Sequence, residues 1–405
     1  MDTITLEEHI RGLAALPATE DPVVSCYAAV ENGRLKHPNL FEEQIRALTT
    51  GLKEKDRSCI EDTVAPIRSI LGTGLSSDAK GVAFFSRAGL TPHFLYLRFR
   101  VAVPTWTSVG RSPNIFHLVE LKDTYDRYVV MLSTRDRVRI MEINLGEPKE
   151  HVRVQSPNVR KEARDRWTKE HYQRNLRENH HRFIKEQVRV LERLMAEGGH
   201  KHLVLVGHPK MTARVREELP RGLAETLVEE VRVSEKGSTS DIVQATIKAF
   251  VEAEERESRE LAETLAEQVH SGGLAVAGVR ASYAALERGQ VDTLVLLRDC
   301  NPGLVWRCRA CKHVFIESEA TISATCPECD NESLESLNMK EELVRMAETQ
   351  HCAVEVVNES AFLTEVEGVG CLLRYRESRD GVLSGAGETS RRWQPMWSHG
   401  NEVYL

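Results

Sequence analysis

The sequence lacks the features that mark membrane and secreted proteins. Its 405 residues contain no apolar run close to the eighteen or so residues that a membrane-spanning helix needs. The first 22 residues carry acidic side chains, whereas a secretory signal has a basic start and an apolar stretch. We therefore expect a cytoplasmic protein with no membrane partner.

The sequence also lacks a net positive charge. It has 54 Lys and Arg residues against 61 Asp and Glu residues, a net charge of -7, which argues against a generic nucleic-acid binder and predicts no DNA partner. The charges are unevenly spread, however. Residues 153–189 hold 11 basic and 5 acidic residues, whereas residues 217–267 hold 14 acidic and 6 basic residues. The net value therefore averages one basic and one acidic segment.

Motifs of nucleotide-binding enzymes and hydrolases are missing. The glycines at 272, 273 and 278 match neither a GxGxxG fingerprint nor a phosphate-binding loop, and the sequence has no GxSxG. His180-His181 and His200-x-His202 lack the spacing of a helical zinc site, so we predict surface or nucleic-acid-facing histidines. An esterase or nuclease that uses His180, His181 or nearby carboxylates is the enzymatic alternative.

The length of 405 residues predicts two to three domains, and apolar periodicity predicts the α/β (α+β) class. Strands are predicted at 23–30, 81–86, 94–103, 128–132, 138–143, 203–206, 293–297, 353–357 and 372–375. Helical patterns are predicted at 5–16, within 40–70, at the end of 153–189, within 217–267, at 279–287 and at 340–348, and a loop is predicted at 104–113. Residues 378–398 have the composition of a flexible tail with Trp393 and Trp397 as anchors.

Cysteine spacing gives the sharpest prediction. Nine cysteines without a secretory signal do not indicate a disulfide framework. Two CxxC pairs, Cys308 with Cys311 and Cys326 with Cys329, are separated by fourteen residues and lie between predicted elements of one α/β sheet. Two such turns complete a closed four-sulfur site, so we predict one structural zinc per chain, and the alternative is four unrelated core cysteines. We expect the other five cysteines to be mostly buried thiols.

The basic segment contains the candidate RNA-binding residues. Apolar positions are scarce in it before Phe183, whereas arginines and aromatic residues suit phosphates and bases. The candidates are Arg153, Arg160, Lys161, Arg164, Arg166, Trp167, Lys169, Arg174 and Arg177. The alternative is a solvated helix face.

From about Asp123 to Arg376 the chain resembles the archaeal and eukaryotic class-I peptide-chain release factors and their Pelota relatives. The resemblance rests on the hairpin 127–143, the helix with Asn179-His180-His181-Arg182-Phe183, the strand and turn 203–209, the stretches 274–276, 284–289 and 292–294, and Gly368-Val369-Gly370-Cys371-Leu372-Leu373-Arg374-Tyr375. The resemblance implies a middle domain that reaches the peptidyl-transferase centre. It also implies a third domain, of the kink-turn-binding ribosomal-protein type, that contacts a translational GTPase.

One departure from the family bears on function. Release factors carry a Gly-Gly-Gln loop between the hairpin and the long helix, and this sequence has no Gly-Gly-Gln and no stop-codon motif in residues 1–120. We therefore expect no peptidyl-tRNA hydrolysis and no enzyme. The bacterial branch of the family, which includes a hibernation factor without the hydrolytic triplet, is similar in domain order.

These observations predict a three-domain, release-factor-like architecture. The segments are an N-terminal α/β domain facing the decoding centre (1–121), a middle domain (122–237), a C-terminal α/β domain (238–378) with a zinc-ribbon insertion at about 303–336, and a tail (379–405). We expect a monomer that binds rRNA in the A site of the 70S ribosome as a hibernation factor in the stress response, with an elongation-factor-type GTPase as a further partner. The alternatives are Pelota-type rescue of stalled ribosomes and a zinc-ribbon adaptor that binds RNA or protein off the ribosome.

Overall fold

The computed structural model describes residues 2–134, 137–155, 169–234, 237–311, 313–316 and 325–376. The described residues form two compact units, one from 3–124 with 255–376 and one from 125–254. The long helix α8 (Thr239–His270) contributes its first half to the second unit and its second half to the first. In the part of the chain that the structure describes, no helix combines the length and apolarity of a membrane span.

The N-terminal part of the first unit is a five-stranded antiparallel sheet with helices on it. The strands run in the order β2-β1-β3-β4. Strand β5 pairs with residues 23–27 of β1, on the edge opposite β3. Their bounds are β1 (Val23–Glu31), β2 (Arg34–Leu35), β3 (Gly81–Arg87), β4 (His93–Phe99) and β5 (Trp106–Gly110). Helices α2 (Pro38–Thr49) and α3 (Glu54–Thr73) cover one face through buried residues such as Phe41, Ile45 and Val64. Helices α1 (Thr3–Ala14) and α4 (Phe116–Thr124) contact each other and the C-terminal part.

The C-terminal part of the first unit is a mixed four-stranded sheet in the order β11-β17-β12-β16. Strands β12 and β16 are parallel, and β17 runs antiparallel to both β11 and β12. The elements are β11 (Ala275–Ala277), α9 (Val279–Glu287), β12 (Val291–Leu297), α11 (Met339–Thr349), β16 (Ala353–Val357), α12 (Ala361–Glu365) and β17 (Val369–Leu373). A separate sheet in the order β14-β13-β15 is inserted between β12 and α11; its strands are β13 (Leu304–Cys308), β14 (Val314–Ile316) and β15 (Leu334–Asn338).

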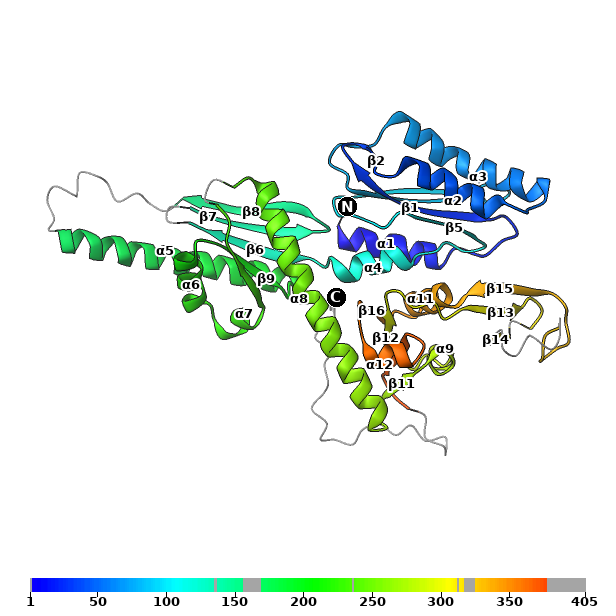
Figure 1. Ribbon diagram of the computed structural model, residues 1–405. Helices are drawn as coiled ribbons and strands as arrows, with labels where there is room; N and C mark the ends of the chain where they lie inside the picture. The colour runs from blue at the N-terminus through cyan, green and yellow to red at the C-terminus, as the bar shows by residue number, and fades with distance from the viewer. Residues whose placement is uncertain are drawn as a thin grey trace, which may run out of the picture. The chain divides into compact units, whose positions relative to one another are not determined.

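The second unit is a mixed sheet between helices, in the strand order β10-β9-β6-β7-β8. Its elements are β6 (Tyr128–Ser133), β7 (Arg137–Asn144), β8 (Glu147–Gln155), α5 (Lys169–Gly198), β9 (Leu203–Gly207), α6 (Pro209–Glu218), α7 (Arg221–Glu225) and β10 (Leu227–Val231). One face packs against α5 and α6, and the other packs against the first half of α8 through Ile242 and Phe250. Figure 1 shows α5 and α8 on the two sides of this sheet.

The structure confirms the mixed α/β class and the insertion of the cysteine segment into an α/β sheet. Two sequence predictions were wrong. The stretch 104–113, predicted as a loop, contains strand β5, whose short length and flanking Pro104 and Pro113 hide its pattern. The stretch 217–267, predicted as helical, contains strand β10, which pairs with β9 at the edge of the sheet. Pairing with a distant strand decided both segments.

Apolar side chains in the second half of α5 pack against the sheet of the second unit. Leu191 is completely buried among the strands, whereas its neighbour Glu192 is exposed. We expect Leu191→Ala to lower the free energy of unfolding of the second unit by about 2–5 kcal/mol, because the change removes buried methyl groups and leaves a cavity. The matched control Glu192→Ala should change it by less than about 0.5 kcal/mol. Hydrogen exchange of the β6 and β9 amides measures the free energy of unfolding in both variants. An equal loss in the two variants would contradict this packing.

Candidate metal centre and RNA interface

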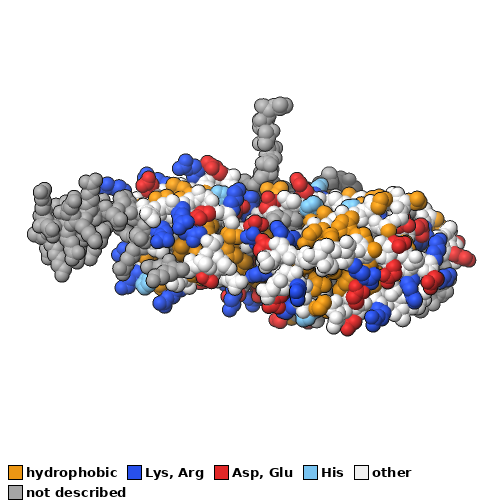
Figure 2. Space-filling view, turned by 90° about the horizontal axis from the view of Figure 1, so that it is seen from above, with side chains coloured by type: hydrophobic (Ala, Val, Ile, Leu, Met, Phe, Trp, Pro, Cys, Tyr) orange, Lys and Arg blue, Asp and Glu red, His pale blue; other side chains and the backbone are white. Residues whose placement is uncertain are grey.

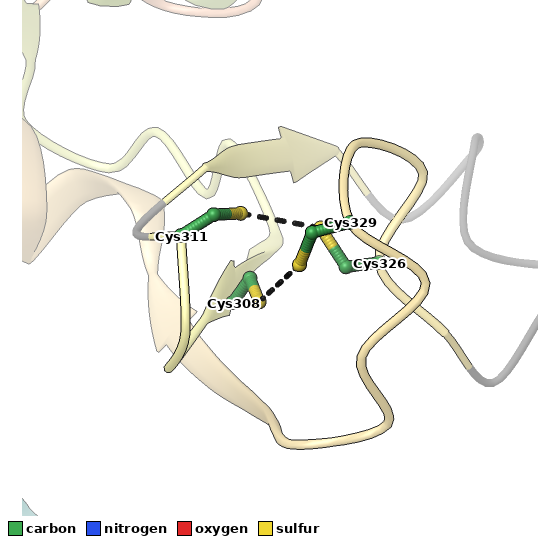
Figure 3. Close-up of side chains that lie close together, drawn as sticks. All are labelled: Cys308, Cys311, Cys326 and Cys329. Atoms are coloured by element: carbon green, nitrogen blue, oxygen red, sulfur yellow. Dashed lines mark hydrogen bonds between the residues drawn. The ribbon is translucent and has the colours of Figure 1, made fainter.

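The four cysteines of the two CxxC pairs lie together in the ribbon sheet. Their sulfur atoms are all within 4.8 Å of one another. The closest pairs are Cys308 with Cys329, at 3.5 Å, and Cys311 with Cys326, at 3.6 Å. Figure 3 shows the four side chains directed toward one another. A tetrahedral ion with metal–sulfur bonds of about 2.3 Å requires sulfur–sulfur separations of about 3.8 Å, so the distances fit one ion.

The local structure explains how the ligands meet. Cys308 ends β13, and the turn to β14 is closed by its N–H donating to the carbonyl of His313. In the second turn the N–H of Cys326 donates to the carbonyl of Asn331. The only buried apolar residue beside the cysteines is Phe315, with Trp306 and Leu334 partly buried around it, among the described residues of this cluster. With so small a core, we expect the ribbon to need a bound metal ion for stability.

The thiol chemistry also fits a metal. A hydrogen bond from the backbone N–H of Cys311 lowers the pKa of the Cys308 thiol to about 7. Backbone hydrogen bonds also lower the pKa of Cys311 and of Cys329, but hydrogen bonds with the neighbouring sulfurs outweigh them, so both pKa values are raised, that of Cys329 to about 12. A bound metal ion would favour the thiolate form of all four. Four sulfur ligands complete a tetrahedral shell and leave no position for substrate, which is the composition of a structural zinc site. The structure therefore brings the predicted ligand set together, and the identity of the ion stays a prediction.

The structure places the predicted RNA-binding residues in three groups. Arg160, Lys161, Arg164, Arg166 and Trp167 lie outside the described residues. Lys169, Arg174 and Arg177 lie on the first turns of α5, where the structure describes the backbone but not the side chains. Arg153 is described, and it is exposed on the edge strand β8.

Arg153 belongs to a group of arginines that the sequence reasoning missed. The register of β7 with β8 puts Arg153 directly opposite Arg139, and Arg137 lies two residues before Arg139 on the same face of the sheet. We call Arg137, Arg139 and Arg153 the arginine face. Val138 and Val154 point to the α5 side, so the arginine face lies on the α8 side of the sheet, where Arg139 Nη2 donates to Thr239 Oγ1 over 2.9 Å. Strand alternation within 137–153 would have revealed this face.

Acidic neighbours neutralise part of the arginine face. Arg139 is held by Glu150, with 2.8 Å between Nε and Oε1. This ion pair offsets the repulsion of two opposed arginines. Arg153 has no ion-pair partner among the described residues, and neither has the partly buried Arg137. On the face of the second unit visible at the left of Figure 2, Lys and Arg side chains outnumber Asp and Glu side chains. Among the described residues, Arg153 is thus an exposed arginine without a carboxylate partner and can contact an anionic group such as a phosphate, whereas the Nε of Arg137 is buried.

The predictions for the histidines have different outcomes. His181 is exposed, as predicted, and its Nδ1 lies 3.0 Å from Glu218 Oε1; the side chain of His180 lies outside the described ones. The prediction that His200 and His202 face the surface was wrong, because both are buried at the start of β9. His202 packs edge-on against Phe250, and burial lowers its pKa to about 4. Burial also lowers the pKa of His200. His200 and His202 are therefore neutral side chains buried in the second unit.

Comparison with known proteins finds similarity over residues that include most of the second unit. Residues 113–251 match the model of the bacterial archaeo-eukaryotic release factor family 10. Peptide chain release factor subunit 1 of Pyrococcus abyssi (strain GE5 / Orsay) is 31% identical over 140 residues, which cover 30% of this chain and 33% of that protein. The chain therefore aligns with about a third of the length of this curated relative.

Solved structures give longer but weaker matches. Pelota of Archaeoglobus fulgidus is 13% identical, with 92% of each chain covered and a TM-score of 0.38. The archaeal translation termination factor aRF1 is 16% identical, with 93% of this chain and 99% of that chain covered and a TM-score of 0.26. The identification therefore rests on the family model and on the archaeal relative. The predicted resemblance is confirmed over residues 113–251, which match the model of the bacterial archaeo-eukaryotic release factor family 10.

Proposed function

We propose that this chain is a non-enzymatic translation factor of release-factor build that binds the A site of the 70S ribosome as a hibernation factor. The observation that carries the proposal is the family match of residues 113–251. The interval between β8 and α5, where release factors have Gly-Gly-Gln, reads Gln155-Ser156-Pro157-Asn158-Val159-Arg160-Lys161 and continues without that triplet. A release-factor-like middle domain without the hydrolytic loop supports binding without peptide release.

Charge supports rRNA as the binding partner. The arginine face and the basic segment together span residues 137–189, around the β8-to-α5 connection. Arginine is suited to phosphate because its guanidinium group donates two parallel hydrogen bonds. In this proposal the middle domain, 122–237, places these residues toward the peptidyl-transferase centre. The N-terminal domain, 1–121, faces the decoding centre.

The acidic segment supports a protein partner. The part of α8 that belongs to the first unit exposes Glu255, Glu260, Glu263 and Glu267. Phosphates repel such a surface, whereas a basic protein surface is attracted to it. We propose that the C-terminal domain, 238–378, uses it to contact an elongation-factor-type GTPase.

The main test of this function is the salt dependence of ribosome binding. Each phosphate contact releases counterions, so six to ten contacts should weaken binding by about 10³ to 10⁵ between 50 and 200 mM salt. Cosedimentation of the purified chain with vacant 70S ribosomes across that range measures the slope. Binding that ignores salt, or no binding to vacant ribosomes, would reject the proposal. Imaging of the complex then shows whether the A site is occupied.

The enzymatic alternative makes a separate prediction. His181 is a surface residue paired with Glu218, and no serine or cysteine is hydrogen-bonded to it among the described residues. We therefore expect neither ester nor RNA hydrolysis. Hydrolysis that disappears in His181→Ala but persists in the nearby Lys185→Ala would replace the proposed function with an enzymatic one.

The biological setting can be tested in cells. We propose a role like that of the ribosome hibernation factor Balon, so ribosome pull-downs from starved cells should contain more of this chain than pull-downs from growing cells. Enrichment on stalled ribosomes of growing cells would instead favour rescue of the Pelota type. Crosslinking to RNA or protein away from ribosomes would favour the zinc-ribbon adaptor.

A further inference from the structure

The first unit contains a groove that the proposed function does not use. It has a volume of about 850 Å³ and lies between β5 of the N-terminal sheet and β15 of the ribbon sheet. Ion pairs connect its two sides: Arg111 pairs with Glu20 and Glu335, over 3.0 and 3.4 Å, and Arg309 pairs with Glu20 over 3.2 Å. The walls thus belong to one compact unit.

Both long walls of the groove end in strands with a free edge. Strand β5 pairs with β1 alone, and β15 pairs with β13 alone, among the strands that the structure describes. The outer edge of such a strand presents backbone N–H and C=O groups without strand partners. An extended peptide can satisfy these groups by adding one more strand. The backbone of the groove is therefore suited to an extended chain.

The side chains of the groove combine apolar and acidic character. Leu52 is 38% exposed and Leu304 is 44% exposed, and both line the groove. Trp306 also lines the groove, and its buried indole N–H has no acceptor among the described residues. Six acidic and four basic residues line the groove. Three of the four basic residues, Arg111, Arg309 and Arg345, already form ion pairs. The groove thus has an acidic surplus beside an apolar surface.

We propose that this groove binds an extended basic and aromatic peptide, and that its occupant is residues 390–397 of this same chain. That segment reads Ser-Arg-Arg-Trp-Gln-Pro-Met-Trp, with two arginines, two tryptophans and no acidic residue. Arg391 and Arg392 complement the acidic surplus, and Trp393 and Trp397 cover the exposed leucines.

The chain is long enough for this contact. The described part ends at Arg376, whose guanidinium donates to the carbonyls of Gly272 and Ala275 and so anchors the start of the tail on the first unit. The fifteen residues from there to Arg391 span up to about 50 Å when extended. A compact unit of this size has a radius of gyration on the order of 18 Å. The segment can therefore reach surfaces across the same unit.

Photocrosslinking of the full-length chain tests the proposal. Benzoylphenylalanine replaces Leu52 in the groove in one sample and, in another, Phe94, which is 42% exposed on β4 and does not line the groove. Irradiation of the purified protein without ribosomes should join position 52, but not position 94, to the peptide that contains residues 390–397. Mass spectrometry of mixed light and heavy isotope-labelled chains should show the link within one chain. Because ribosomes are absent, failure here is distinct from failure of the proposed function.

Tail variants supply the second measurement, and they leave the folded core unchanged. Trp393→Ala with Trp397→Ala should lower the crosslinking yield by about tenfold or more, because tryptophans commonly anchor interfaces. Arg391→Glu with Arg392→Glu should lower it as well, whereas the matched pair Val382→Ala with Leu383→Ala should not. Crosslinks from position 52 to β15, to a second copy, or to no part of the tail would overturn the proposal.

Discussion

Reversing four charges in the basic segment is expected to weaken binding to 70S ribosomes about a thousandfold at 0.15 M salt, because each phosphate contact contributes a counterion-release term of nearly one power of salt concentration. The substitutions are Arg160→Glu, Lys161→Glu, Arg164→Glu and Arg166→Glu. The magnitude of the slope of log affinity against log salt concentration should also decrease by about four. Cosedimentation at several salt concentrations measures both quantities.

The control for this variant reverses four charges elsewhere. The control positions are exposed and lie outside the basic segment: Arg221, Lys248, Arg256 and Arg259. Changing these four residues to Glu gives the control the same net charge as the first variant. We expect at most a several-fold loss of affinity in the control, from long-range charge alone. Equal losses in the two variants would show that net charge, rather than the segment, drives binding. Circular dichroism of both variants checks that the fold is kept.

Loss of one ribbon cysteine is expected to abolish metal binding and to unfold the ribbon. Elemental analysis should find one zinc per wild-type chain and none in Cys326→Ser, because a closed site needs all four sulfurs and metal binding supplies most of the stability of so small a core. Apparent binding free energies of structural zinc sites are about 10–16 kcal/mol, so the effect on the ribbon is large. Hydrogen exchange should show lost protection in β13 and β15.

The control for the metal prediction is Cys59→Ser, which removes a partly exposed thiol far from the CxxC pairs in sequence. It should keep one zinc per chain and the protection of the ribbon. Strands β6 and β9 of the second unit should stay protected in both variants, since their core contains no residue of the ribbon. A metal-free wild-type chain with a fully protected ribbon would contradict the structural role.

Local patterns were enough for the metal site and for much of the fold. A CxxC turn brings two sulfurs to one side of an ion whatever surrounds it, so the spacing alone predicted the ligand set that the structure brings together. Strong apolar runs likewise predicted β9 and β16, because such runs are stable only when they are buried in a sheet. Gly289 follows the helix predicted at 279–287, and its φ of 67° is the left-handed conformation that ends a helix.

Features that depend on distant partners were not predictable in this way. Strands β5, β8 and β10 are short or largely exposed, and they exist because a neighbouring strand supplies their hydrogen bonds. The arginine face was missed for the same reason, since Arg139 and Arg153 are opposed only in the register of β7 with β8.

The sequence by itself determined the four-cysteine set, the basic and acidic segments and the release-factor resemblance, because each is carried by residue type and spacing along the chain. Tertiary structure alone decided that His200 and His202 are buried, that three arginines share one face of a sheet, and that β5 and β15 border one groove. The physical reason is common to these three. Burial, register and the shape of a groove are set by contacts between segments far apart in the chain, and their free energies outweigh the local preferences of each residue.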